Sequence, residues 1–228
     1  MANEPRHRDA YPPPPWRLGG WGIATVGLLA SAAAAEFVPE GAQLVTVLPG
    51  KTVGGMFFLA YEFGSLVYRE LNVVAGLVRV GARLAFVLPR LYVDSPASLA
   101  GGREIWAVPK ELATFEIGQL DGETSIDVAQ GARRICCLRS RGSGPRLCLP
   151  LPLPSLGVRD ETFAFFTARL RAAFSLANVD VTLGPGSEFA ALGLERPRFG
   201  VRCDDLTLAV PAPLAIRRLL PRSAQSAC

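Results

Sequence analysis

Residues 44–61 read LVTVLPGKTVGGMFFLAY, two apolar runs that are separated by a Pro-Gly turn. The first run, Leu44–Leu48, is rich in β-branched residues. The second run, Gly54–Tyr61, is apolar and partly aromatic and ends near Gly64. β-branched and aromatic residues favour strands, while Pro-Gly favours a tight reversal of the chain. This stretch therefore predicts neighbouring strands of an antiparallel sheet.

The same pattern of short apolar runs between glycines and prolines continues along most of the chain. It predicts a mainly β (α+β) fold, in which an antiparallel sheet closes or doubles over. A further strand is expected directly before Lys110. The other expected strands cover residues 67–80, 83–93, 114–120, 124–130, 135–138, 179–183, 199–203 and 206–210.

Two helices are predicted to flank the sheet. A short helix capped by Ser31 follows a strand at 21–28, and a long helix begins at Asp160 and ends near Leu176. The region 139–154, which contains the run LPLPLP, is expected to be an irregular connection. The long helix is predicted from four apolar residues at helical spacing, Phe163, Phe166, Leu170 and Phe174.

Length and composition favour one globular domain. Half of the 228 residues are hydrophobic and 19% are charged, so we expect a single domain over 16–220 between tails at 1–15 and 221–228. The apolar run 21–35 is shorter than the ~20 residues that a membrane span needs. The same run could be the apolar part of a secretory signal, but the polyproline stretch directly before it is not typical of such signals. A cytoplasmic protein without membrane contact is therefore predicted.

The scarce histidine and cysteine residues exclude several kinds of site. His7, in the N-terminal tail, is the only histidine, which excludes a Ser-His-Asp triad and a zinc site built on histidines. The five cysteines form no C-x-x-C pair, and Cys136-Cys137 is expected to pack in a strand, so reduced thiols and no metal are predicted. A net charge of +4 without a nucleic-acid motif gives no reason to expect nucleic-acid binding.

Lysine is rare in this chain. Of 24 cationic Lys and Arg residues, only Lys51 and Lys110 are lysine. An arginine side chain stays protonated, whereas a buried lysine can lose its proton and attack a carbonyl carbon. From composition alone, Lys110 is either a surface charge or a reactive amine.

The residues around Lys110 resemble the acetoacetate decarboxylase family. The resemblance rests on Tyr68-x-Glu70, Tyr92-Val93-Asp94, Gly102-Arg103-Glu104 and Pro109-Lys110, in this order and spacing. It implies that the sheet closes into a β-barrel or cone with a few flanking helices, and that the chain assembles from dimers.

The resemblance also implies roles for individual residues. Lys110 forms a Schiff base with a small oxo or keto substrate, and no cofactor or metal is required. Acetoacetate decarboxylase is the standard example of a lysine activated by desolvation or by a cationic neighbour. Glu70 corresponds to the acidic residue near that lysine, where it moves protons. The implied substrate-binding residues are Tyr68, Tyr92, Trp106 and Arg103, and Arg103 and Glu104 are expected to form buried structural pairs.

Three positions depart from the family pattern. Glu111 stands where decarboxylases carry a second lysine, although alternation along a strand can turn it away from Lys110. Gly20 lies near the place of an arginine that meets the substrate carboxylate, with Arg17 as the nearest arginine. Phe57 and Phe58 replace a further glutamate. These departures suggest a larger or less acidic substrate than acetoacetate.

The sequence therefore supports three functional hypotheses. The first is a carbon–carbon lyase that decarboxylates a β-keto acid through a Lys110 imine. The second keeps the imine but not the loss of CO₂, as in an aldolase or dehydratase. The third is a noncatalytic barrel that binds an apolar ligand.

Overall fold

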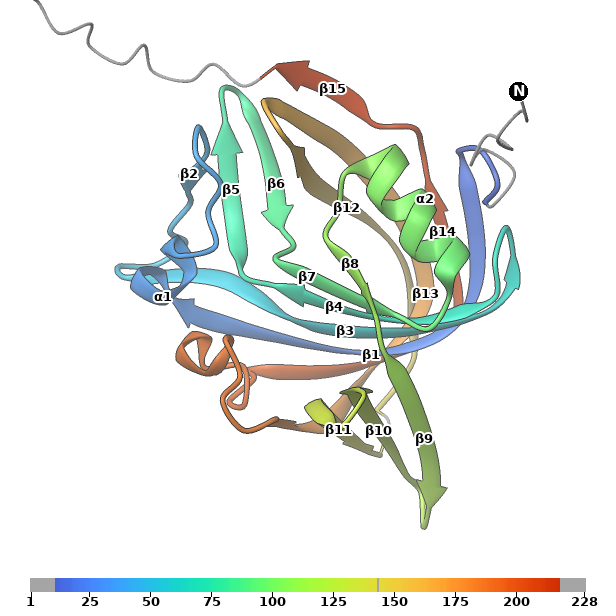
Figure 1. The fold of residues 1–228 in the computed structure, drawn as a ribbon. Coiled ribbons are helices and arrows are strands. Elements are labelled where there is room, and N and C mark those ends of the chain that lie inside the picture. The colour runs from blue at the N-terminus through green and yellow to red at the C-terminus, as the bar shows by residue number, and fades with distance from the viewer. Residues whose placement is uncertain (1–10, 143, 218–228) are drawn as a thin grey trace, which may run out of the picture.

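The computed structural model describes residues 11–142 and 144–217, and these form a mainly β fold (Figure 1). This confirms the predicted class. Fifteen strands belong to one hydrogen-bonded sheet, and the helices are α1 (Ser31–Ala35), α2 (Pro96–Trp106) and the 3-10 helix η2 (Ala190–Leu192). The strands are β1 (Trp16–Ala30), β2 (Gln43–Leu44), β3 (Lys51–Gly64), β4 (Tyr68–Val74), β5 (Gly76–Val80), β6 (Arg83–Val87), β7 (Arg90–Val93), β8 (Lys110–Leu112), β9 (Thr114–Leu120), β10 (Glu123–Gln130), β11 (Arg133–Arg141), β12 (Leu147–Arg159), β13 (Thr162–Leu183), β14 (Phe199–Val210) and β15 (Leu214–Arg217).

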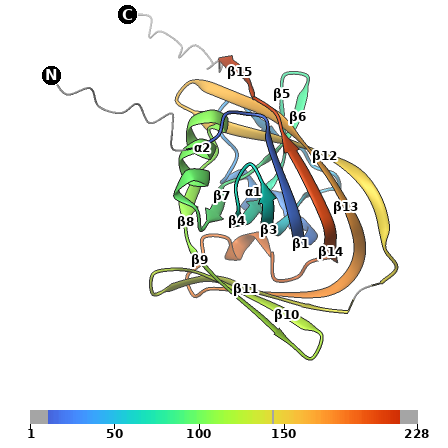
Figure 2. The ribbon, with the colours of Figure 1, turned by 90° about the vertical axis from the view of Figure 1, so that its right-hand side faces the viewer.

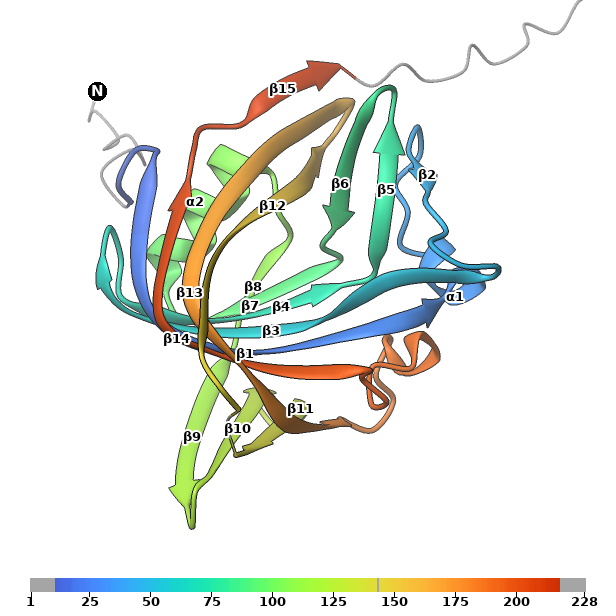
Figure 3. The same cartoon turned by 180° about the vertical axis from the view of Figure 1, so that it is seen from behind.

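The sheet coils around an interior, as Figures 2 and 3 show from two further sides. Its main path runs β2-β5-β6-β12-β13-β14-β1-β3-β4-β7-β8, and β9, β10 and β11 extend from the second half of β13. Most pairs are antiparallel, but β6–β12 and β7–β8 are parallel. The expected closure into a barrel is not confirmed, because the path within the described residues ends at β2 and β8.

The long helix expected after Asp160 is wrong, since residues 162–183 form strand β13. Asp160 and Glu161 instead make the two-residue turn between β12 and β13, with Asp160 at a φ of 48°. A spacing of four residues fits both a helix and one face of a strand, so the aromatic pattern was ambiguous. The alternation Ala168-Arg169-Leu170-Arg171, buried then exposed, was the strand signal.

The proline-rich run at 150–154 is also a strand, contrary to the expected connection. Pro150, Pro152 and Pro154 occupy alternate positions of β12 opposite β13. Alternate residues direct their backbone groups to the same side, so the missing N–H groups all fall on one edge. β12 pairs with β6 only at Ser155 and Leu156, which leaves no strand beside the prolines along that edge. The ladder with β13 therefore loses no donor.

A helix precedes Lys110, where a strand was expected. The Ser95 side chain accepts a hydrogen bond from the Ser98 N–H, and Pro96 stands at the start of α2, which is a typical N-terminus. The helix ends at Ala107, which has a φ of 54°. At α1, Ser31 is not the cap, because Ala30 holds that position without a side-chain hydrogen bond. No helix in the described ranges is long and apolar enough to cross a bilayer.

The described part of the predicted N-terminal tail is held against α2. The Trp16 Nε1 donates to the Pro12 carbonyl oxygen at 2.7 Å, and the Tyr11 hydroxyl donates to the Glu104 carboxylate on α2. Residues 1–10 and 218–228 lie outside the described residues. These contacts close the N-terminal end of β1 over the helix.

Buried apolar residues form two clusters on opposite faces of the curved sheet. One cluster packs β1, β3 and β4 against η2 and the β9–β11 extension, with Phe58 in contact with Trp21 and Phe115. The other surrounds the interior and includes Trp16, Tyr68 and Trp106. The interior cluster supplies the walls of the candidate site.

We expect Phe58→Ala to destabilise the protein strongly, because Phe58 is completely buried. Truncating a buried phenylalanine lowers the free energy of unfolding by about 3–5 kcal/mol. Phe63→Ala on the same strand is the matched control, because Phe63 is 59% exposed and its loss should lower that free energy by less than about 1 kcal/mol. Urea unfolding measures both, and equal effects would contradict the described burial of β3.

Candidate active site

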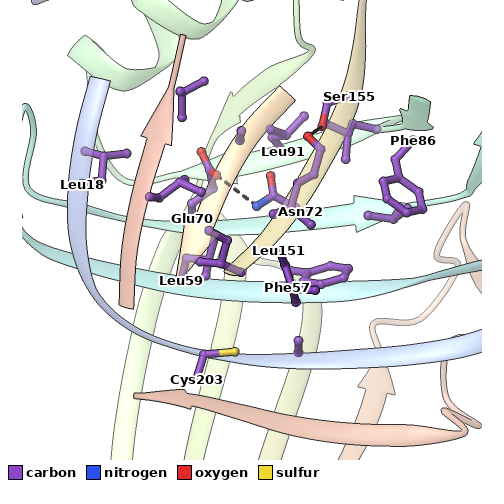
Figure 4. A pocket seen from close by; sticks show the side chains of 18 of the residues that line it. Leu18, Phe57, Leu59, Glu70, Asn72, Phe86, Leu91, Leu151, Ser155 and Cys203 are labelled. Atoms are coloured by element: carbon purple, nitrogen blue, oxygen red, sulfur yellow. Dashed lines mark hydrogen bonds between the residues drawn. The ribbon is translucent and has the colours of Figure 1, made fainter. Parts of the chain in front are cut away.

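A cavity of about 410 Å³ lies inside the coiled sheet, and one face of β4 supplies its polar wall. Successive strand residues point to opposite sides, so Tyr68, Glu70, Asn72 and Val74 all face the cavity. Figure 4 shows Glu70 and Asn72 side by side on this wall, with leucine and phenylalanine side chains around them. The cavity is therefore apolar with one polar stretch.

Lys110 enters the cavity from β8, beside β7. In the parallel β7–β8 pair Leu91 lies opposite Lys110, and across β4 the same residue lies opposite Asn72. Leu91, Asn72 and Lys110 consequently share the cavity face of three adjacent strands. This register brings the side chains of Lys110 and Glu70 together although they are 40 residues apart.

The Lys110 ammonium group is buried and has three oxygen acceptors. Lys110 is 4% exposed, and its Nζ donates to Glu70 Oε2 at 2.6 Å, to the Ser98 hydroxyl at 2.8 Å and to the Tyr68 hydroxyl at 3.5 Å. The Tyr68 and Trp16 ring centroids lie 5.1 Å and 5.8 Å from Nζ. These contacts use all three N–H groups of an ammonium ion.

Glu70 is held from its other side by an amide. Asn72 Nδ2 donates to Glu70 Oε1 at 3.0 Å, and the Tyr68 hydroxyl donates to Oε2 at 3.3 Å. Each carboxylate oxygen thus has a partner, so the buried side chain of Glu70 is fixed towards Lys110. A buried ion pair is stable only when its remaining hydrogen-bonding positions are filled in this way.

Two tyrosines beside the ion pair stay protonated. Burial, followed by the charge of Glu70, raises the pKa of both Tyr61 and Tyr68 well above the usual value. The Tyr61 hydroxyl is buried and has no hydrogen-bond partner among the described residues. Both phenols are therefore available to donate a proton in a hydrogen bond, but not to act as bases near neutral pH.

Helix α2 covers Lys110 with one of its faces. Ser98, Gly102 and Trp106 are spaced by four residues and are buried on this face. A Cβ atom at Gly102 would lie 2.5 Å from Cδ and 2.7 Å from Cε of Lys110, so only glycine leaves room for the lysine chain. The helix end is fixed as well, because the Val158 N–H donates to the Ala107 carbonyl oxygen at 2.9 Å.

Four of the predicted site residues meet, and two do not. Lys110, Glu70, Tyr68 and Trp106 all line the cavity. Tyr92 belongs to the core cluster on the other face of the sheet, where burial, then Glu111 and Glu188, raise its pKa to about 12.

Arg103 and Glu104 are exposed on α2, so the expectation of buried pairing is wrong. Arg103 nevertheless has a structural contact with β8, because its Nε donates to the Lys110 carbonyl oxygen at 2.8 Å. Glu104 accepts the hydrogen bond from Tyr11.

The residues that depart from the family pattern lie both inside and outside the cavity. Glu111 points away from the cavity and pairs with Arg90, with Nε and Oε1 3.1 Å apart. Arg17 is exposed between two cavity residues, and Phe57 lines the cavity. Among the described residues that line the cavity, Lys110 and Glu70 are the charged ones and none is arginine.

Sequence reasoning missed Ser98, Asn72 and Tyr61. Asn72 follows Glu70 by two residues on a strand, so the alternation that placed Tyr68 and Glu70 together also predicts it. Ser98 stands four residues before Gly102 and is recognisable only once the segment is known to be a helix. Tyr61 reaches the site through its pairing with Tyr68 across β3 and β4, which no local pattern reveals.

Among the described residues that line the cavity, the one cysteine is Cys203. Burial, followed by Asp204, raises the pKa of the Cys203 thiol on the cavity wall to about 12, so this thiol stays protonated. Burial also raises the pKa of Cys136. Within the described ranges, no three His, Cys, Asp or Glu side chains gather in a way that could hold a metal ion.

We expect Lys110→Met to lower the free energy of unfolding by about 3–5 kcal/mol, because it leaves the Glu70 carboxylate buried without its cation. The double variant Lys110→Met with Glu70→Leu should recover most of this loss, since it replaces the whole pair by apolar groups. Lys51→Met is the matched control at an exposed lysine. Urea unfolding of the parent protein and the three variants decides; a double variant that is less stable than Lys110→Met would contradict a buried pair.

Comparison with known proteins agrees with this geometry. The model of the family "Acetoacetate decarboxylase (ADC)" matches residues 1–151. In solved structures, acetoacetate decarboxylase of Legionella pneumophila has a TM-score of 0.74 at 15% identity and covers 97% of this chain and 94% of its own. The enduracididine biosynthesis enzyme MppR, complexed with the condensation product of pyruvate and imidazole 4-carboxaldehyde, has a TM-score of 0.66 at 14% identity, with 92% of each chain covered.

Plant proteins are similar over part of the chain. Protein NEOXANTHIN-DEFICIENT 1 of Arabidopsis thaliana is 31% identical over 113 residues, which cover 49% of this chain and 40% of the plant protein. Its counterpart in Oryza sativa subsp. japonica is 32% identical over 109 residues, or 47% of this chain and 36% of that protein. The matched segment thus spans less than half of either relative. From the family match and the shared fold, the chain belongs to the acetoacetate decarboxylase family.

Proposed function

We propose that this protein is a carbon–carbon lyase that forms a Schiff base between Lys110 and an oxo-substrate, and that it decarboxylates a β-keto acid. One observation carries the proposal: the buried Lys110 Nζ lies 2.6 Å from Glu70 Oε2 at the wall of an apolar cavity. A desolvated lysine beside a group that can take its proton is a typical amine nucleophile.

The first half of the proposed reaction makes the imine. Glu70 takes a proton from Lys110, and the neutral amine attacks the substrate carbonyl carbon. A C–N bond forms, the C=O π bond breaks, and the oxygen takes a proton from the attacking nitrogen to become a hydroxyl. Glu70 then returns its proton to this hydroxyl, which leaves as water and yields a protonated imine. A carboxyl group that moves one proton in each direction suits general acid–base catalysis.

The second half breaks the carbon–carbon bond. The electron pair of the bond to the carboxylate flows into the protonated imine, so that CO₂ leaves and an enamine remains. The enamine carbon takes up one proton from solvent water, and water then adds to the protonated imine to release the ketone and free Lys110. In this proposal the protonated phenol of Tyr61 donates a hydrogen bond to the substrate oxygen, while the Tyr68 hydroxyl keeps its hydrogen bond to Glu70.

An imine enzyme without CO₂ loss is the second candidate, and the absence of arginine from the described cavity lining favours it. A substrate carboxylate would have Lys110 as its only cationic partner there, and Glu70 already occupies that partner. The MppR structure with a condensation product of pyruvate and an aldehyde supplies a family precedent for a non-decarboxylated ligand. Measuring CO₂ release together with carbonyl turnover separates the two reactions.

Assembly from dimers and a cytoplasmic location are further proposals. The first follows from the family and the second from the cysteine pattern. The four described cysteines are free thiols, which is compatible with a reducing compartment. Size-exclusion chromatography with light scattering tests the assembly.

Borohydride reduction in the presence of oxo compounds should attach the substrate carbon skeleton to Lys110. The chain has two lysines, so Lys51→Arg leaves Lys110 as the sole lysine amine and should keep full labelling. Lys110→Arg keeps a cation at the site but should lose the adduct, because guanidinium is not a nucleophile. Intact mass and peptide mapping measure this; labelling at Lys51 or at the N-terminus alone would refute the proposal.

Glu70→Gln should slow adduct formation by about 10²–10⁴-fold, because the amide keeps the shape of Glu70 but cannot carry the proton. Glu116→Gln, at an exposed glutamate of β9, is the control and should leave the rate unchanged. Stopped samples reduced with borohydride give the rates by mass spectrometry. A rate within about threefold of the parent protein would remove Glu70 from the mechanism, provided circular dichroism shows both variants folded.

A further inference from the structure

The cavity continues well beyond the reactive amine. From Glu70 the cavity wall follows β4 through Asn72 to Val74, a distance of four residue steps, or about 13 Å at the usual rise of ~3.3 Å per residue. The adjacent β3 contributes Phe57, opposite Asn72, and then Val53. Figure 4 shows Phe57 and Phe86 on the far side of Asn72 from Glu70.

The far part of the cavity contrasts with the polar stretch. The side chains of Glu70 and Asn72 are joined by a hydrogen bond. Past Asn72 the wall includes Val74, Phe57 and Phe86. Ser155, beside Phe86, is the polar residue there, and its hydroxyl donates to the Leu153 carbonyl oxygen. The opposing β12 adds Leu151 and Leu153. A small keto acid held at Lys110 would leave this apolar surface uncovered, while a volume near 410 Å³ falls in the range of about 300–1,000 Å³ typical of pockets for larger ligands.

Charge in the cavity restricts the ligand further. Lys110 and Glu70 neutralise each other, and the other described lining residues carry no charge. A second charge at the far end of a substrate would be desolvated without a partner, which is strongly unfavourable. The walls therefore match an uncharged hydrocarbon extension.

We propose that the substrate carries a long, uncharged apolar arm, which lies along β3 and β4 from Lys110 past Asn72 to Phe57 and Phe86. The class is a methyl ketone, or a β-keto acid that yields one, with an extended hydrocarbon chain. The reaction at Lys110 rests on the proposed function, but binding of the arm does not require imine formation.

Affinity for unbranched methyl ketones, from acetone upward by one methylene at a time, tests the arm. Trp16 and Trp106 line the cavity, so quenching of tryptophan fluorescence reports binding. The dissociation constant should fall by about fourfold for each buried methylene and level off once the chain reaches Phe57. The same ketones with a terminal carboxylate should bind at least about tenfold more weakly. A flat series, or tighter binding of the carboxylates, would overturn the inference.

Two phenylalanines of β3 provide a matched pair of variants. Phe57→Ala should weaken binding of the longest ketones several-fold and leave acetone unchanged. Phe63→Ala, at an exposed ring outside the cavity, should change neither. An equal effect of Phe57→Ala on short and long ketones would also count against the arm.

The series is repeated with Lys110→Arg to separate the two proposals. If chain-length dependence persists but no ketone is trapped at Lys110 of the parent protein, the proposed chemistry fails and the apolar arm stands. If ketones are trapped at Lys110 without any dependence on chain length, the chemistry stands and the arm fails.

Discussion

The buried ion pair between Lys110 and Glu70 is the interaction on which the site depends. Both side chains are at most 8% exposed, in a cavity where the described lining residues carry no other charge. Charges so placed are strongly destabilising unless each is paired and hydrogen-bonded. Ser98, Tyr68 and Asn72 meet that requirement, so the surrounding structure holds two reactive groups in contact before any substrate arrives.

The shape of the site follows from strand alternation and from one helix. Alternation on β4 and β8 turns Glu70 and Lys110 inward and sends Glu111 to the opposite face, where it pairs with Arg90. Helix α2 then closes over the lysine, and the absence of a side chain at Gly102 gives the lysine chain its space. Glycine is unfavourable inside a helix by about 1 kcal/mol, and here close packing explains its presence.

The same cavity reconciles family membership with the departures in sequence. Lysine and glutamate retain the parts needed for imine chemistry, whereas the described lining without arginine and with Phe57 favours a hydrocarbon extension over a second carboxylate. A site of this kind discriminates against a ligand whose binding leaves a buried polar or charged group without a partner. The proposed chemistry and the proposed substrate arm therefore occupy different parts of one wall.

The mainly β class and the family were predictable from the sequence, because they depend on local alternation and on motif spacing; the same motifs predicted Lys110 and Glu70 as site residues. Sequence reasoning misassigned β13 because a spacing of four residues suits two kinds of secondary structure, and it missed α2 because Gly101 and Gly102 weaken a helix on local grounds. Asn72 follows from the same alternation as Glu70, whereas the positions of Ser98 and Tyr61 beside the lysine, and of Tyr92 away from it, are visible only in the folded structure. The physical reason is that these contacts arise from strand register and helix packing between segments distant in the chain, which no local propensity encodes.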